Sequence, residues 1–250
     1  MKKHHTLFIA LLQGLMMIPA VLVAQQNEAD TRQRGDHNQG TTTQSGTQQI
    51  STIDQWGRYN EGEVEQTGQH NTATIDQDGF YNWPNYGRFN AAYTRQAGKR
   101  NHAEAWQDGD RNASQIRQTG ERHIAINDQD GTRNTITIEQ QGARNQSFVD
   151  QNDGNPQPNP GEDNATTVHQ AGKDNWQQTE QTGEHHDAWL YQYGDRNWSR
   201  TDQVGRDHNS DTHITGHRNT TEVWQTGQRH RSVIRVNGHR NTSYVQQDNL

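Results

Sequence analysis

The sequence predicts an all-β protein, a β-solenoid of two-stranded coils of about 22 residues each. Three observations lead to this fold class: a motif that recurs every eleven residues, alternation of residue type with period two inside each repeat, and a glycine at a fixed place between the alternating segments. An ordinary core is excluded, because only 26% of the 250 residues are hydrophobic, against about 45 to 50% in typical domains. Order must therefore come from the repeat.

The repeated motif is Gln-x-Gly followed two residues later by Asn. Within a run its copies begin eleven residues apart, as at Gln44, Gln55 and Gln66. Two later copies, at Ile214 and Val236, lack the Gln but keep the Gly and Asn in phase. A right-handed hendecad coiled coil would also have an eleven-residue step, but a Gly and an Asn in every period disfavour a helix.

The residues between one Asn and the next Gln alternate as a strand does. Asn71, Ala73, Ile75 and Gln77 share one face, which we expect to point inward. The glycine supplies the positive φ of a tight turn. Each repeat is thus one strand and one turn, which gives 18 strands from Asn38 onward and roughly nine coils.

The pairing of strands into coils follows from turn chemistry. Asp78, Asp108 and Asp130 follow every second strand, which favours a repeat of two strands, one on each side of a flattened coil. Two inserts, near residues 83–89 and 152–163, interrupt the step and hold every proline outside the leader. Proline cannot donate to a strand ladder, so we expect both inserts to protrude from the same edge.

The chain divides into a leader, a polar segment and the repeat region. Residues 1–24 have the features of a secretory signal peptide: lysines at positions 2 and 3, an apolar stretch and a small residue before polar Gln25. Residues 25–37 are polar and outside the repeat, as in a frayed terminus. The solenoid is expected over residues 38–247, before a tail at 248–250. The chain has no cysteine, so no disulfide can stabilise it.

Stacked amides are the predicted source of stability. A buried Gln or Asn is costly alone, but in register each side chain can donate to its counterpart one coil away. The predicted ladder residues are Gln44, Gln55, Asn60, Gln66, Asn71, Gln77, Gln96, Asn101, Gln107, Asn112, Gln118, Gln129, Asn134, Gln140, Asn145, Gln170, Asn175, Gln181, Gln192, Asn197, Gln203, Asn219, Gln225 and Asn241.

The motif Gln-x-Gly-x-x-Asn-x-Ala-x-x-x-Gln resembles the curlin repeats of curli fibre subunits. Two copies carry the resemblance, QTGQHNTATIDQ from Gln66 to Gln77 and QAGKRNHAEAWQ from Gln96 to Gln107. The chain departs from that family in its length, in its two proline inserts, and in Gln177, which occupies a slot that is small elsewhere.

The resemblance implies a secreted structural subunit of an extracellular amyloid-like fibre on the bacterial cell surface, in biofilm matrix and adhesion. It also implies export through a curli-type outer-membrane channel, with residues 25–37 as an export signal, and assembly with a partner curlin subunit. Independently of the family, a solenoid with uncapped ends exposes unpaired strand edges, and end-to-end contact of this kind is open-ended. We therefore expect the chain to polymerise with copies of itself.

Three histidines replace the ladder Asn at 22-residue intervals, His186, His208 and His230. In two-stranded coils they stack on one edge. A tolerated replacement of the amide, a transition-metal site and a pH-dependent brake on assembly all fit this pattern.

Outward tryptophans give the alternative function, a monomeric secreted adhesin or glycan-binding solenoid. Trp176 and Trp198 occupy the same outward position in neighbouring coils, and Trp189 also faces outward. Such aromatics can hold a polysaccharide or pack across strands.

Other classes of function find little support. A net charge of −7 argues against a nucleic-acid-binding domain, which carries a basic stripe. Arginines such as Arg100 and Arg218 precede the ladder Asn in many turns, as expected of solubility and register devices. No catalytic motif is present in the sequence, so we expect neither an enzyme nor a cofactor.

Overall fold

The protein folds as a β-solenoid of two parallel sheets. The structure, a computed structural model, describes residues 26–78, 89–152 and 163–249, and these ranges contain 19 strands and no helix. None of the described residues, accordingly, forms an apolar helix long enough to cross a membrane. The predicted fold class, an all-β solenoid of about nine stacked coils, is confirmed.

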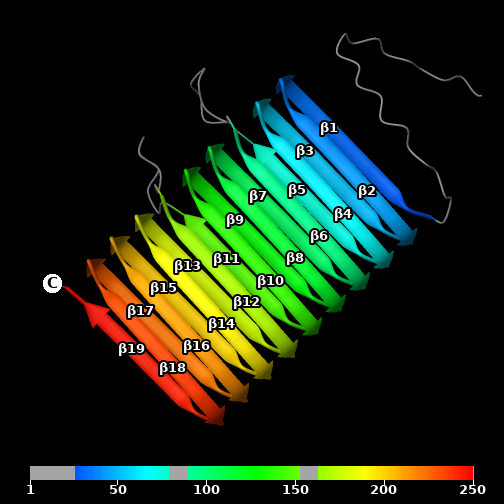
Figure 1. Ribbon diagram of the computed structural model, residues 1–250. Coiled ribbons are helices and arrows are strands. Elements are labelled where there is room, and N and C mark those ends of the chain that lie inside the picture. Colours follow the sequence, from blue (N-terminus) through cyan, green and yellow to red (C-terminus); the bar gives the residue numbers. More distant parts are fainter. Residues whose placement is uncertain (1–25, 79–88, 153–162, 250) are drawn as a thin grey trace, which may run out of the picture.

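The two sheets collect alternate strands of the chain (Figure 1). The first sheet, here the odd sheet, contains β1 (Glu28–Asp36), β3 (Ile50–Arg58), β5 (Thr72–Asp78), β7 (His102–Asp110), β9 (Ile124–Thr132), β11 (Gln146–Asn152), β13 (Trp176–Glu184), β15 (Trp198–Arg206), β17 (Thr220–Gln228) and β19 (Thr242–Asp248). The second, the even sheet, contains β2 (Gln39–Thr47), β4 (Glu61–Gln69), β6 (Ala91–Lys99), β8 (Ala113–Glu121), β10 (Thr135–Ala143), β12 (Ala165–Lys173), β14 (Asp187–Asp195), β16 (Asn209–His217) and β18 (Arg231–His239).

Equivalent residues of successive coils lie opposite one another. Gln55 pairs with Gln33 on one side and with Gln77 on the other, in parallel register. Asp78 likewise pairs with Asp108 in the odd sheet. One coil is therefore two strands, as the alternating turn chemistry predicted. Consecutive coils stack along one axis, with β1 at one end and β19 at the other (Figure 1).

The solenoid begins earlier than the sequence analysis placed it. β1 covers most of residues 25–37, the segment expected to lie outside the repeat, and pairs with β3 along its whole length. The physical reason is that this segment already carries the inward pattern: Asn27, Ala29, Thr31 and Gln33 repeat the spacing of later coils. The solenoid boundary at Asn38 was therefore wrong, and 19 strands replace the predicted 18.

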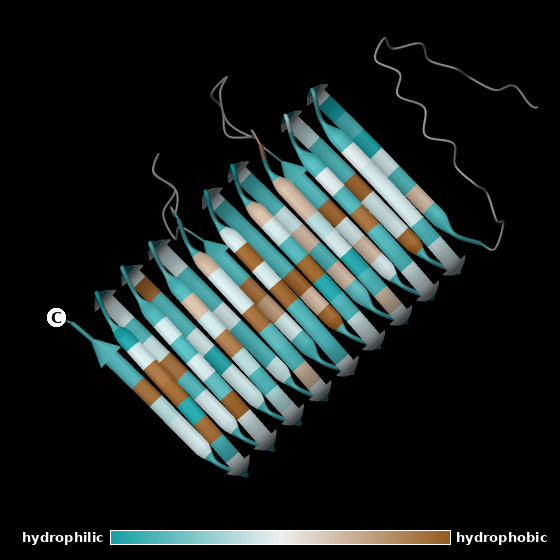
Figure 2. Ribbon diagram, in the orientation of Figure 1, coloured by the Kyte–Doolittle hydropathy of each residue, from teal (hydrophilic) through white to brown (hydrophobic). Residues whose placement is uncertain are grey.

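The interior is thin and alternates with the pleat. In β5, Ala73, Ile75 and Gln77 are buried, while the residues between them are not. Many of the brown segments in Figure 2 lie in the central part of the strands, and several lie beside one another in successive coils. A Cβ added to Gly62 would lie 3.0 Å from Ile53 Cγ2 of the other sheet. Small residues at this slot thus let the two sheets approach closely.

Gln177, which stands in that small slot, is accommodated by hydrogen bonds. It is fully buried, and its Nε2 donates to Ser147 Oγ at 2.6 Å. Its Oε1 accepts from Thr179 Oγ1 at 3.1 Å. Thr179 occupies a position that is Ile or Val in many coils, so the larger Gln177 is matched by a smaller neighbour.

Each turn between strands that the structure describes in full has two residues with positive φ. In the turn after β4 they are Gly68 (φ 116°) and His70 (φ 57°). The glycine is required for a reason beyond its φ: a Cβ there would lie 2.0 Å from the carbonyl oxygen of Gly98 in the next coil. The close stacking of the turns therefore excludes any side chain at this position.

The signal peptide predicted at residues 1–24 lies outside the described residues, as do the central parts of both proline inserts. The strands that precede the inserts, β5 and β11, belong to the same sheet. Both connections therefore leave the solenoid from the same edge, three coils apart.

Candidate functional site: amide ladders and exposed end strands

The glutamines of the odd sheet form one continuous ladder through the solenoid. Each Nε2 donates to Oε1 of the glutamine in the next coil, at 2.7 to 3.1 Å. The members are Gln33, Gln55, Gln77, Gln107, Gln129, Gln151, Gln181, Gln203, Gln225 and Gln247. The remaining N–H crosses to the other sheet, as in the 3.0 Å bond from Gln55 Nε2 to the Gln39 carbonyl. Each glutamine thus links both its neighbouring coils and the two sheets.

The ladder of the even sheet is shorter. It runs from Gln44 through Gln66, Gln96, Gln118, Gln140 and Gln170 to Gln192, with donor–acceptor distances of 2.8 to 2.9 Å. Ile214 and Val236 occupy the next two places in register and are buried. Here the amide ladder gives way to an apolar stack.

The asparagines act differently from the prediction that each donates to its counterpart. Asn112 Oδ1 instead accepts the backbone N–H of Asn134 in the next coil, at 3.0 Å. Its Nδ2 donates to the Asp108 carbonyl four residues earlier and to the Gly131 carbonyl of the next coil. Direct Asn–Asn side-chain bonds occur at only a few places, such as Asn219 to Asn197. The asparagine ladder therefore satisfies turn backbone, because the short side chain reaches the backbone more easily than the next amide.

The three ladder histidines stack as planar rings on one edge of the even sheet. The ring centroids of His186 and His208 are 4.9 Å apart, and those of His208 and His230 are 5.1 Å apart. Each ring reproduces the contacts of asparagine. His208 Nε2 lies 3.0 Å from the Val204 carbonyl, four residues earlier, and its Nδ1 lies 3.2 Å from the backbone N–H of His230.

This geometry assigns a neutral ring with the proton on Nε2, since Nε2 faces a carbonyl and Nδ1 faces an N–H. Burial lowers the pKa of His186 to about 4, and burial also lowers the pKa of His208. In His186 and His208 both ring nitrogens are engaged, which leaves no lone pair for a metal. No group of three potential metal ligands was found in the described part of the chain. The contacts favour the replacement of an amide over a metal site.

The predicted set omitted several ladder residues of the expected type, such as Asn90 and Asn164, and two of unexpected type. His123 is buried before β9 and accepts the backbone N–H of Asn145 through Nδ1, at 3.3 Å, so it is a fourth histidine in an asparagine place. Gln49 precedes β3, where its longer side chain leaves a buried Oε1 with no hydrogen-bond partner. The spacing alone could have identified both residues, because each lies five residues after the ladder glutamine of the preceding strand.

The predicted tryptophan group is divided between the two faces. Trp176 and Trp198 lie in the odd sheet with their rings 5.0 Å apart and nearly parallel, whereas Trp189 lies in β14 of the even sheet. Because Trp176 and Trp198 cover each other's faces, fewer ring faces are open to a sugar. This arrangement favours cross-strand packing over the glycan-binding alternative.

The end strands are the exposed parts of the ladder system. β1 is exposed at eight of its nine residues, and the inner residues of β19 are only half-buried. The odd ladder is also directional: Gln33 donates to Gln55 at one end, and Gln247 accepts from Gln225 at the other. One end therefore presents an amide oxygen, and the opposite end presents an amide N–H.

These features define a class of protein, a parallel β-solenoid stabilised by stacked amides whose described end strands are open to pairing. The family model described as "Curlin associated repeat" matches residues 52–79 and 131–155. The match in these two repeat regions supports the curlin-repeat family that the motif resemblance predicted. No curated protein matches the chain.

Proposed function

We propose that the protein is a structural subunit of a curli-like amyloid fibre that grows by addition of strands at the solenoid ends. The observation that carries the proposal is the polarity of the odd glutamine ladder. Gln247 of one copy can donate to Gln33 of the next, so the bond that joins coils within the chain also joins copies. Such head-to-tail contact does not close on itself and yields a filament.

The family match and the predicted leader support the proposed location. Curlin-repeat proteins are structural components of cell-surface fibres, which supports an extracellular, non-enzymatic role in biofilm matrix and adhesion. We place export at a curli-type outer-membrane channel and initiation on a partner curlin subunit. Because β1 uses residues 28–36 in the folded state, the proposed export signal at residues 25–37 would be read before folding.

The test is seeded growth. The chain from Gln25 onward is diluted from denaturant and followed by thioflavin fluorescence and electron microscopy, alone and with preformed seeds. Seedable filaments are expected. A stable β-rich monomer that ignores seeds would overturn the proposal.

A matched pair of variants locates the growing contact in β19. Val245→Lys with Gln247→Lys places two charges on the inner face of the last strand, where they should block stacking. Tyr244→Lys with Gln246→Lys adds the same charge on the outer face, where Tyr244 is 55% exposed. Only the inner pair should abolish elongation. Equal growth of both variants would exclude this end as the contact.

A further inference from the structure

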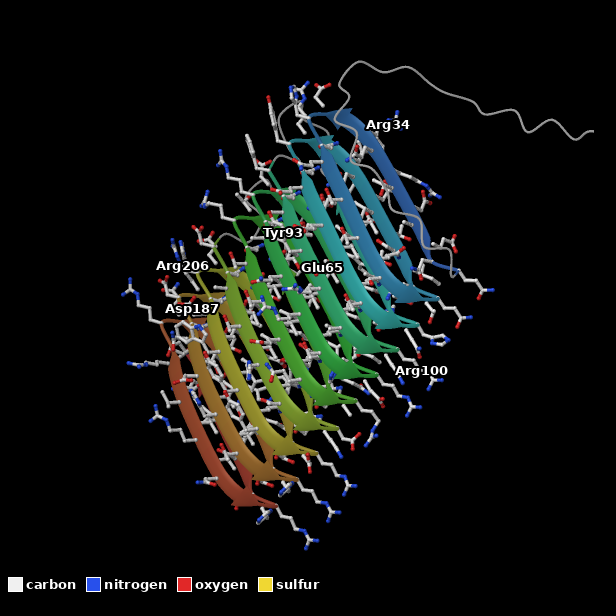
Figure 3. The ribbon with its side chains drawn as sticks, turned by 45° about the vertical axis from the view of Figure 1, so that its right-hand side comes forward. Arg34, Glu65, Tyr93, Arg100, Asp187 and Arg206 are labelled. Carbon is white, nitrogen blue, oxygen red and sulfur yellow. The ribbon has the colours of Figure 1, made fainter. Side chains whose placement is uncertain are left out.

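One edge of the solenoid carries a line of arginines. They occupy the positive-φ position of the turns that follow the even strands, and all are exposed. This basic edge comprises Arg100, Arg122, Arg144, Arg196, Arg218 and Arg240, with Asp174 in the one intervening coil. In Figure 3, Arg100 points away from the solenoid in a line of nitrogen-tipped side chains along that edge. Successive coils are about 4.8 Å apart, so the line repeats at that spacing.

On the opposite edge most arginines form ion pairs. There Arg133 forms a two-pronged contact with Asp163 at 2.7 and 2.9 Å, and Arg206 lies 3.4 Å from Glu184. On the basic edge Arg144 pairs with Asp174. Across the described ranges, no carboxylate lies within ion-pair distance of the remaining five arginines. Their charge is therefore available to a partner.

Backbone preference does not explain arginine at these places. The positive-φ region is costly for most side chains, and Asn, Asp and His enter it more readily than Arg does. Arg196, Arg218 and Arg240 have φ between 57° and 58°. A residue that the backbone disfavours, repeated coil after coil, points to a use for the guanidinium group itself.

The basic edge is hollowed near the C-terminal coils. A groove of about 690 Å³ runs there, lined by Arg196, Arg218, Arg240, Lys173, Asp174 and Asp195, among others. His217 and His239 also line it, with their rings stacked at 5.0 Å. The lining thus combines guanidinium donors with carboxylate acceptors from several successive coils.

We propose that this groove binds a linear carboxylated polysaccharide, with its chain along the stacking axis. Guanidinium groups hold carboxylates in a two-pronged geometry. Asp174 and Asp195 can accept hydrogen bonds from sugar hydroxyls, which a polyphosphate chain does not offer. The same carboxylates repel the denser charge of nucleic acid, so the mixed lining favours the glycan. Binding does not require polymerisation, since the groove lies within one chain.

Labelled polygalacturonate is the probe, measured by fluorescence anisotropy with the chain from Gln25 onward. Arg196→Asn, Arg218→Asn and Arg240→Asn together remove three charges while Asn tolerates the positive φ. This triple variant should weaken binding about tenfold or more. The matched control removes three arginines from the same turn position on the other edge, Arg111, Arg133 and Arg229. It should change affinity by less than about twofold.

Two further results decide the class of ligand. Neutral dextran should not bind, and duplex DNA should bind more weakly than polygalacturonate. Asp174→Asn with Asp195→Asn removes two negative charges and frees Arg144, so it should strengthen DNA binding more than it strengthens polygalacturonate binding. If both triple variants are folded by circular dichroism and lose polygalacturonate affinity equally, the proposed location of the site on the basic edge is wrong. DNA binding as tight as polygalacturonate binding would contradict the proposal that the ligand is a carboxylated polysaccharide.

Discussion

The two sheets of the solenoid use the same motif but keep it unequally. In the odd sheet the glutamine ladder is unbroken from Gln33 to Gln247, whereas in the even sheet it stops at Gln192. Beyond that point Ile214 and Val236 stack in register on each other. The same coils of the even sheet also have His186, His208 and His230 in place of asparagine.

From this difference we infer that the number of amide-to-apolar junctions, more than the identity of any one residue, sets the stability of a ladder. Two consecutive apolar residues create one amide-to-apolar junction, between Gln192 and Ile214. An apolar residue in the middle of a ladder would create two. The histidines follow the same rule, because each presents to its neighbours the donor and acceptor that an asparagine would.

The largest effect is expected from breaking the odd ladder in its interior. Gln129→Leu removes the acceptor of Gln107 Nε2 and the donor to Gln151 Oε1, both buried. Two unsatisfied amides should lower the free energy of unfolding by about 3 to 6 kcal/mol. Urea unfolding of dilute chain, followed by tryptophan fluorescence, measures it. Ile214→Leu is the control, expected below about 1.5 kcal/mol, and a similar loss in both variants would contradict the ladder account.

The next effect concerns pH. His186 has a folded pKa of about 4, below the value near 6.5 of the unfolded chain, so the unfolded state binds the proton first as pH falls. His186 therefore lowers the free energy of unfolding by about 3 kcal/mol as the pH falls from about 6.5 to 4. Burial raises the pKa of Asp108 to about 6, which acts in the opposite direction over part of this range.

Replacing the histidine isolates its contribution from that of the acids. His186→Asn keeps the ladder contacts without a titrating group, so its stability relative to the unaltered chain should rise as pH falls through this window. His213→Asn, at a half-buried outward position, is the control. If the free energies of unfolding of His186→Asn and of the unaltered chain differ by the same amount at every pH, His186 does not titrate as proposed.

A smaller, stabilising effect is expected at Gln49. Shortening it to asparagine places the acceptor where Asn112 has its own, within reach of the N–H of Asn71 in the next coil. Satisfying the buried oxygen should add about 1 kcal/mol to the free energy of unfolding. Thermal unfolding measures the gain, and Gln48→Asn at the exposed neighbour is the control. A lower melting temperature for Gln49→Asn would show that an asparagine at this position does not make the contacts of Asn112.

The smallest effect should come from Ile214→Gln. This change extends the even ladder by one coil and moves the amide-to-apolar junction to Val236 without adding another. The free energy of unfolding should stay within about 1 kcal/mol. Ile138→Gln, which puts an amide at a fully buried position outside any ladder, should cost more. Equal losses in urea unfolding would mean that the junction count does not govern stability.

The sequence predicted the fold class, the pairing of strands into coils and the inward face, because identical positions must stack for an 11-residue strand-turn unit to bury anything. It also predicted that His186, His208 and His230 stack. It missed β1, whose Ala29 and Thr31 carry the inward pattern but whose neighbours are polar.

The contacts of the asparagines could not be predicted from their spacing. Asn112 and Gln118 both recur every coil, and only the geometry shows that one satisfies turn backbone while the other bonds to its counterpart. The basic edge followed from the alternation of turns, but it was not identified in the sequence because the arginines of both edges were considered together. Arg100 and Arg111 look equivalent in the sequence, yet they lie on opposite edges because successive turns alternate sides.

Diffraction from aligned filaments tests the central claim most directly. If copies add end to end, the stacking axis of the strands is the filament axis, and the reflection at about 4.8 Å will lie on the meridian. The same reflection on the equator would mean that solenoids associate side by side, and it would contradict growth through β1 and β19.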